Sequence, residues 1–175
     1  MQIDKLRKCF DEGIRNGERH KGLRKIRLGV QEAEQHMQKA IHNFEAISEF
    51  RKINFSDWSA SAAFYTLYHG LLAILCLEGY ESRNQSCTFA YIAKMIQEEQ
   101  LHSLSEEDIK EIVDFDVTHD LEHSSSFLDI RETMQYSAKT SMKDEAFESL
   151  KKRTNVLLNK IQLDYEKLLS KKMDK

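Results

Sequence analysis

The most continuously apolar stretch of the chain runs from Asp57 to Tyr80. It contains no proline, and for about six turns it is apolar on nearly every side, which a helix tolerates only where other helices cover it. Ser56 and Asp57 are candidate N-caps, and Gly79 is a candidate left-handed residue at the C-terminal end. We therefore predict the central helix of a bundle. Its larger side chains are expected to fill the space between neighbouring helices: Phe64, Tyr65, Tyr68, Leu71, Leu72, Leu75 and Cys76.

Amphipathic patterns flank this stretch. From about 30 to 50, apolar residues recur at steps of three and four, which places one buried stripe on a helix. The link 51–56 is short, so this helix and the central one should form an antiparallel hairpin. Ser105 with Asp108 fits a capping box at the start of another helix. The pattern predicts further helices over 88–100, 127–138 and 144–169, whereas 118–126 is either a loop or an exposed part of a longer helix.

The N-terminal residues 1–28 have a different composition, with a basic run and four of the six glycines between residues 1 and 29. We expect a short helix over 3–10 and then a less regular, partly flexible segment, followed by a single domain over 29–170. The basic run is either a solvated segment or a phosphate-binding arm. The candidate residues of such an arm are Arg24, Lys25 and Arg27.

The composition narrows the fold class and the partners. A chain of 175 residues without proline favours long helices with short polar joints, so we predict an all-α fold, an up-and-down bundle of about five to six helices. The net charge of -3 gives no overall attraction to nucleic acid or membrane. Polar residues interrupt the most apolar stretch, so no membrane span is expected. Cys9, Cys76 and Cys87 lack metal-ligand spacing and are predicted to be reduced thiols of a cytoplasmic protein.

The common catalytic motifs are missing from the sequence. It has no Gly-rich phosphate loop, no paired-cysteine motif and no HExxH, so neither a cofactor nor a metal is predicted. His119 and His123 are four residues apart and would share a helix face, but they lack a third ligand, which favours an exposed polar loop. His69, inside the central helix, is interpreted as a structural histidine bonded to a neighbour. His36 and His42 are interpreted as residues at the boundary of the buried stripe.

A cluster of charged residues with a phenol lies late in the chain. Asp129 and Glu132 are three apart in the predicted helix, and Arg131 and Tyr136 are five apart on neighbouring faces. An arginine with a nearby phenol can hold a phosphate through charge-assisted hydrogen bonds. Periodicity alone predicts an ordinary set of surface ion pairs.

Three segments, in this order, resemble the HEPN superfamily of small α-helical domains. They are AEQHMQKAIHNFEAI, then SASAAFYTLYHGLLAILCLEGYES in the position of the family's Ala- and Tyr-rich second helix, then IRETMQYS in the position of its late arginine motif. The resemblance covers roughly residues 30–165. It implies an up-and-down bundle that usually forms a two-fold dimer, with the late motifs of both subunits facing each other across a cleft.

Ribonucleolytic members of that superfamily carry an arginine followed, after four to six residues, by a histidine. The arginine maps onto Arg131, but Tyr136 stands where the histidine would be. A phenol with an unperturbed pKa of about 10 is a poor general base near neutral pH. The sequence resembles instead the branch ending in Arg and Tyr, many of whose members bind nucleotides or RNA, or partner a small nucleotidyltransferase, without cutting.

The resemblance therefore implies a homodimeric HEPN-like domain, in a toxin–antitoxin or defence-like setting, that binds RNA or a nucleotide or partners a nucleotidyltransferase. No catalysis of its own is expected. Arg131 would hold phosphate, Tyr136 would stack or hydrogen-bond, and Asp129 or Glu132 would orient Arg131. The basic residues of the N-terminal segment would extend the anionic contact.

Two alternatives stay open. The first is a metal-independent endoribonuclease of the toxin type, in which Arg131 and Tyr136 act with a non-standard base supplied by His119, His123 or His69 across the dimer. The second is a purely structural dimer or an antitoxin-like protein partner.

Overall fold

The computed structural model describes residues 2–15, 17–27, 29–113 and 126–173. Within these ranges the chain forms seven α-helices, one 3₁₀ helix and two short strands, which confirms the predicted all-α helical bundle. The elements in chain order are α1 (Gln2–Ile14), η1 (Gly17–Arg19), β1 (Leu23–Lys25), α2 (Val30–Lys52), α3 (Ser56–Leu77), β2 (Tyr80–Ser82), α4 (Gln85–Gln97), α5 (Glu106–Ile112), α6 (Phe127–Tyr136) and α7 (Asp144–Met173).

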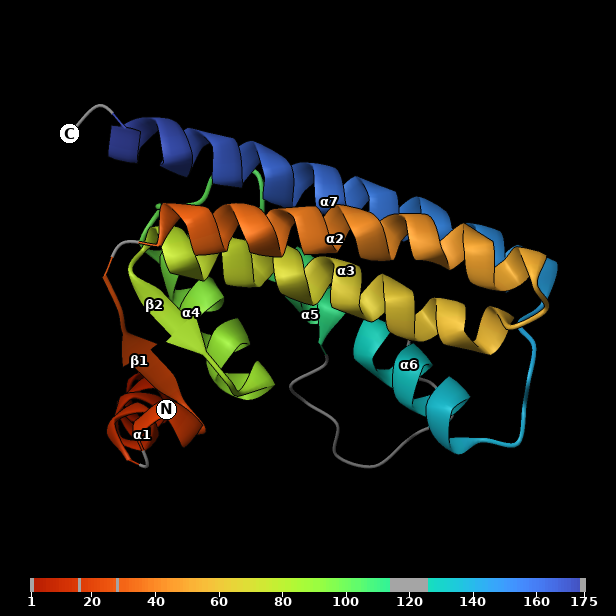
Figure 1. Cartoon of the computed structure of the whole chain (residues 1–175), viewed down its shortest axis with the longest axis horizontal. Helices are drawn as coiled ribbons and strands as arrows, with labels where there is room; N and C mark the ends of the chain where they lie inside the picture. Colours follow the sequence, from red (N-terminus) through yellow and green to blue (C-terminus); the bar gives the residue numbers. More distant parts are fainter. Residues whose placement is uncertain (1, 16, 28, 114–125, 174–175) are drawn as a thin grey trace.

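The central helix of the bundle is α3, as its apolar sequence predicts. It runs antiparallel to α2, while α7 lies along both helices and α4 and α6 lie on the opposite side of α3 (Figure 1). By length and composition alone α3 could cross a membrane, but 83% of its most apolar window is buried inside the bundle. One prediction about this helix is wrong: Tyr65 does not fill the space between helices, because it is 39% exposed.

The ends of α3 are fixed in two different ways. The prediction that Ser56 or Asp57 caps its start is wrong, because Phe55 occupies the cap position without a side-chain hydrogen bond. The Ser56 hydroxyl instead accepts a hydrogen bond of 2.8 Å from the backbone N–H of Met142, which ties the start of α3 to the segment before α7. At the other end Gly79 has a φ of +77°, so the predicted left-handed glycine is confirmed. The capping box at the start of α5 is also confirmed.

The described part of the N-terminal segment lies against the bundle instead of extending from it. Strand β1 pairs with β2 in antiparallel register, with Leu23 opposite Ser82. Two glycines allow this arrangement: a Cβ at Gly13 would overlap the carbonyl of Leu23, and a Cβ at Gly22 would overlap the carbonyl of Cys9. The glycines that suggested an irregular segment therefore permit close contact between the backbones of α1 and β1.

A disulfide joins the N-terminal unit, which consists of α1, η1 and β1, to α4. Cys9 of α1 and Cys87 of α4 are bonded across a sequence separation of 78, so the prediction of three reduced thiols is wrong for these two. Their pairing depends on the packing of α1 beside α4, which the spacing of cysteines along the chain does not reveal. Cys76 is a free, buried thiol, and burial raises its pKa to about 11. A cytoplasmic location stays a prediction, and these two cysteines no longer support it.

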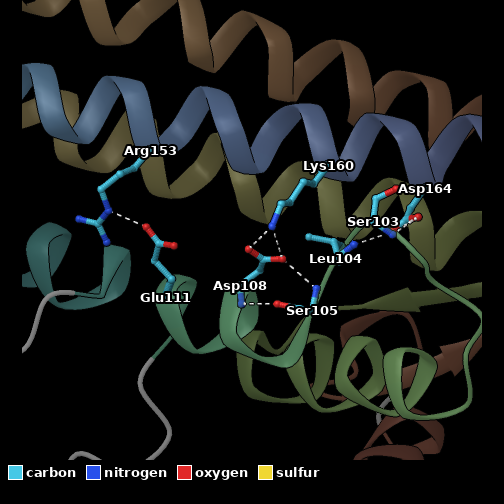
Figure 2. A network of polar contacts seen from close by, with 8 residues as sticks. All are labelled: Ser103, Leu104, Ser105, Asp108, Glu111, Arg153, Lys160 and Asp164. Carbon is cyan, nitrogen blue, oxygen red and sulfur yellow. Dashed lines mark hydrogen bonds and ion pairs between the residues drawn. The ribbon is translucent and has the colours of Figure 1, made fainter.

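A buried carboxylate holds the turn between α4 and α5 on the last helix. Asp164 of α7 is 1% exposed and accepts hydrogen bonds from the backbone N–H groups of His102, Ser103 and Leu104. The bonds to Ser103 and Leu104 are drawn in Figure 2. Their donor–acceptor distances are 2.9 to 3.1 Å, typical of good N–H···O geometry. One side chain thus satisfies three consecutive N–H donors of a turn that has no helix or strand of its own.

Two ion pairs continue this network along α7 (Figure 2). Lys160 Nζ lies 2.7 and 2.9 Å from the two carboxylate oxygens of Asp108, the residue that completes the capping box of α5. Arg153 Nε lies 2.5 Å from Glu111 Oε1. Together with Asp164 they fix α5 and the turn before it along one side of α7.

Candidate functional site

The helix that carries Arg131 begins with a side-chain cap. The Ser126 hydroxyl accepts a hydrogen bond from the backbone N–H of Asp129 and donates one to its carboxylate. Asp129 is buried at this cap, so its carboxylate stabilises the start of α6. The residue that pairs with Arg131 is Glu132, with 3.3 Å between Nη2 and Oε1. Of the two carboxylates predicted to orient the arginine, the structure thus places Glu132 against it.

Arg131 packs against two aromatic rings of α3. The central carbon of its guanidinium lies 4.8 Å from the ring centroid of Phe64 and 5.9 Å from that of Tyr65. Both distances are within the range of cation–π attraction. Arg131 is only 9% exposed, and its Nε is buried without a hydrogen-bond partner. The cation is therefore held in one orientation, with an unused donor.

Two further side chains continue from Arg131 across the same face. The Tyr65 ring centroid lies 6.4 Å from that of His69, one helical turn further along α3. His69 Nδ1 lies 3.0 Å from Nδ1 of His36 on α2, and the two imidazoles are stacked with 5.2 Å between centroids. We call Arg131, Tyr65, His69 and His36 the polar strip. It runs from α6 over α3 to α2.

Burial controls the protonation of the histidine pair. The pKa of His69 is lowered to about 4, mainly by desolvation and then by His36 and Lys39. Burial also lowers the pKa of His36. Both rings are therefore neutral near pH 7. The prediction that His69 is bonded to a neighbour is confirmed, although its neighbour is a second histidine.

A small cavity lies beside the polar strip, between the start of α3 and the end of α6. Its volume is about 170 Å³, and its lining includes Trp58, Ser61, Met134 and Lys139. One water occupies about 30 Å³ of liquid, so the cavity holds roughly five waters or a small polar group. Asp57 also lines it, and its Oδ1 is buried without a hydrogen-bond partner. Because Ser61 precedes Tyr65 by one turn, cavity and polar strip are neighbours along α3.

The remaining predicted binding residues lie in two places, at the end of α6 and on the N-terminal segment. Tyr136, the last residue of α6, is 78% exposed. Arg24 lies on β1, where its Nη2 is 2.5 Å from Glu81 Oε1, and Lys25 and Arg27 are exposed beside it. Strand β1 and α6 lie at opposite ends of α3 (Figure 1). The structure therefore does not bring the basic N-terminal residues to the polar strip.

The candidate bases His119 and His123 lie outside the described residues. Within the described ranges, no group of three or more His, Cys, Asp or Glu side chains is arranged to hold a metal ion. The sequence interpretation missed two members of the polar strip. Tyr65 is four residues before His69, so a shared helix face was a usable signal for it. The approach of His36 depends on how α2 packs on α3, and no local pattern encodes that.

No protein-family model matches the chain, and a search of curated proteins finds no match. The HEPN resemblance therefore rests on the three quoted segments and on their order in a helical bundle, and membership in that superfamily stays a proposal.

Proposed function

We propose that this chain is a HEPN-like domain protein that binds RNA or a nucleotide at the polar strip, without catalysis of its own. The observation that carries the proposal is the buried guanidinium of Arg131, which contacts the rings of Phe64 and Tyr65 and has its Nε unpaired. Because Nε itself is buried, an anionic ligand would reach the guanidinium at Nη2, where Glu132 now lies.

The phosphate group is the ligand chemistry that suits this arginine. Its neighbour Glu132 is half-exposed and only 3.3 Å from Nη2, so it can rotate into solvent when an anion arrives. Guanidinium groups bind phosphate through charge-assisted N–H···O bonds, and the contacts with Phe64 and Tyr65 hold this guanidinium in place before a ligand arrives.

Exposed aromatic rings on α3 suit a nucleobase. Trp58 is 52% exposed and Tyr65 39%, and both lie on the accessible side of α3. Stacking of a base on such a ring contributes about 1–3 kcal/mol. The cavity beside Trp58 is too small for a whole nucleotide, so it would accept one edge of a base. Tyr136, whose neighbours Gln135 and Ser137 line that cavity, keeps the stacking role expected from the sequence.

The proposed absence of catalysis rests on the chemistry of the His69 imidazole. His69 is neutral at pH 7 and can accept a proton, but a base with a pKa of about 4 is weak compared with the near-neutral value that favours general-base catalysis. The endoribonuclease stays the second candidate, because Tyr65 connects Arg131 to His69 on one face. Homodimerisation and a nucleotidyltransferase partner rest on the resemblance and are part of the proposal.

The test measures retention and cleavage of a labelled RNA pool by purified protein, with and without EDTA, and with unlabelled mononucleotides as competitors. We expect retention without cleavage, unaffected by EDTA. Arg131→Ala should weaken retention by about 10–150-fold, the loss of one charge-assisted contact worth 1.5–3 kcal/mol. The slope of log affinity against log salt should become shallower by about 0.7 for each phosphate contact removed.

Two further variants separate this site from general charge and from misfolding. Arg15→Ala removes one positive charge directly after α1, which lies at the far end of the molecule from α6 (Figure 1), and should leave retention nearly unchanged. Tyr65→Ala removes a partly exposed ring, and thermal unfolding checks that each variant folds. Cleavage that persists in EDTA and disappears in Arg131→Ala would replace the proposal by the endoribonuclease. A result with neither retention nor cleavage would overturn both candidate functions and favour a protein partner.

A further inference from the structure

The cavity between the start of α3 and the end of α6 is lined by two opposite charges from different elements. Asp57 lines it from the first turn of α3, and Lys139 lines it from the link between α6 and α7. Asp57 Oδ1 is buried without a hydrogen-bond partner. Among the described residues, Asp57 and Lys139 form no ion pair with each other. The cavity thus offers a charged acceptor and a charged donor, and neither is used by the other.

We propose that this cavity selects guanine, so that the RNA or nucleotide of the proposed function, on which this inference rests, is bound through a guanine base. One edge of guanine carries two adjacent donors, N1–H and N2–H, beside the acceptor O6. A carboxylate has two acceptor oxygens, and an ammonium has only donors. The Asp57 carboxylate therefore accepts from N1–H and N2–H, while the Lys139 ammonium donates to O6.

The carboxylate can reach this position because no hydrogen bond holds it in its present one. A buried polar atom without a partner is destabilised by the loss of its hydration. The terminal torsion of an aspartate side chain is broad, so the Asp57 carboxylate can turn until both oxygens face the donors. Asp57 as a whole is half-buried and lines the cavity, so this rotation leaves the helix unchanged.

The other bases do not present this order of donors and acceptors. Adenine and cytosine each place a ring nitrogen acceptor beside their amino donor, and uracil has one donor between two acceptors. Each of them therefore directs at least one acceptor at the Asp57 carboxylate, which repels it. A good bidentate contact discriminates between bases by about 5–150-fold.

The cavity lies one helical turn from Arg131 on both helices that form it. On α6, Arg131 and Gln135 are four residues apart and share a face, and Gln135 lines the cavity. On α3, Ser61 lines the cavity, and Tyr65, one turn further on, contacts Arg131. Four residues of helix span about 6 Å. Base and phosphate of one nucleotide are joined by a single sugar, so the base edge can enter the cavity while the phosphate reaches Arg131.

The ring of Trp58 adds affinity without adding selectivity. Trp58 also lines the cavity and is 52% exposed, so its indole can stack on the base whose edge enters. Stacking tolerates any base because every base has an aromatic face. Asp57 and Lys139 therefore carry the choice of base, and variants of the three residues have different expected effects.

Fluorescence anisotropy with short single-stranded RNAs tests the proposal. The ligands are labelled uridine oligonucleotides that carry one central guanosine, inosine, adenosine or cytidine, and an all-uridine strand. We expect the guanosine strand to bind about 5–150-fold more tightly than the adenosine, cytidine and all-uridine strands. Inosine lacks the N2 amino group, so its strand should bind with intermediate affinity.

Four variants identify the residues that select the base. Asp57→Asn keeps the size of the side chain but replaces one acceptor oxygen by an NH₂ group, so it should abolish the preference for guanosine. Lys139→Met should reduce that preference in part, whereas Trp58→Leu should weaken the binding of all strands alike. Glu148→Gln, which removes an exposed carboxylate of α7, is the control. Because the preference is a ratio of affinities within one protein, a general effect of net charge cancels.

The outcomes distinguish guanine selection from the proposed function. Equal binding of all strands, a preference for another base, or a preference for guanosine that persists in Asp57→Asn would overturn guanine selection and leave RNA binding intact. Binding of none of the strands would overturn both.

Discussion

Replacing Asp164 by alanine should cost this fold a large part of its stability. The carboxylate accepts from three consecutive backbone N–H groups, and a hydrogen bond to a charged group contributes about 1.5–3 kcal/mol. In Asp164→Ala the N–H of Leu104 is left buried, whereas those of His102 and Ser103 are part-buried and can recover water. We therefore expect a loss of about 3–5 kcal/mol in the free energy of unfolding, mostly below the simple sum of about 4.5–9 kcal/mol for three such bonds.

Urea denaturation followed by circular dichroism measures this loss. With a slope near 2 kcal/mol per molar urea, the midpoint should fall by about 2 M. Asp164→Asn keeps the shape of the side chain but presents an NH₂ group to the N–H donors, so its loss in unfolding free energy should be about half as large. This variant keeps the test usable if the alanine variant does not fold. Glu166→Ala, an exposed change on the same helix, is the control. A midpoint shift in Asp164→Ala no larger than that of Glu166→Ala would refute the role given to this carboxylate.

Three other expectations follow from the described contacts. Cys9→Ser, or reduction by dithiothreitol, should lower the unfolding free energy by about 2–4 kcal/mol in urea titrations, because the disulfide with Cys87 closes a long loop. Gly13→Ala should lower the Tm markedly in calorimetric scans, since its methyl group would overlap the carbonyl of Leu23. Below pH 6.5 the unfolded chain protonates His69, whereas the folded chain does not until about pH 4. Wild type should therefore lose more stability than His69→Gln as the pH falls from 6.5 to 4. Urea midpoints of the two proteins at several pH values measure this difference.

The helical architecture follows from features that local sequence expresses well. The apolar stretch of α3 predicted a covered helix, the stripe of α2 predicted its partner, and Ser105 with Asp108 predicted the start of α5. Each of these signals lies within a few residues of the structure it predicts. That is why the helices were identified while the number and exact ends of the shorter ones were not.

The features that sequence analysis missed all depend on contacts between distant parts of the chain. Strands β1 and β2 have three residues each, too few for a periodic pattern, and exist because they pair with each other. The glycines of the N-terminal unit resembled those of a loop because nothing local indicates that another backbone lies against them. At the site, the sequence identified Arg131, but its contact with Tyr65 depends on how α6 packs on α3. The basic residues Arg24, Lys25 and Arg27 lie at the other end of α3, and this placement also depends on packing between distant parts of the chain.

The position of α3 in the chain has a consequence for how the protein is made. A ribosome completes this helix at Leu77, but α7, which covers one of its sides, ends only at Met173. At about 5–20 residues per second, roughly 100 residues of further synthesis leave that apolar side uncovered for about 5–20 s. Pairing with α2 can begin at once because the two helices are adjacent in sequence, whereas the surface meant for α7 is available to chaperones or to other nascent chains. Slow translation between these helices would lengthen that exposure and favour aggregation over folding.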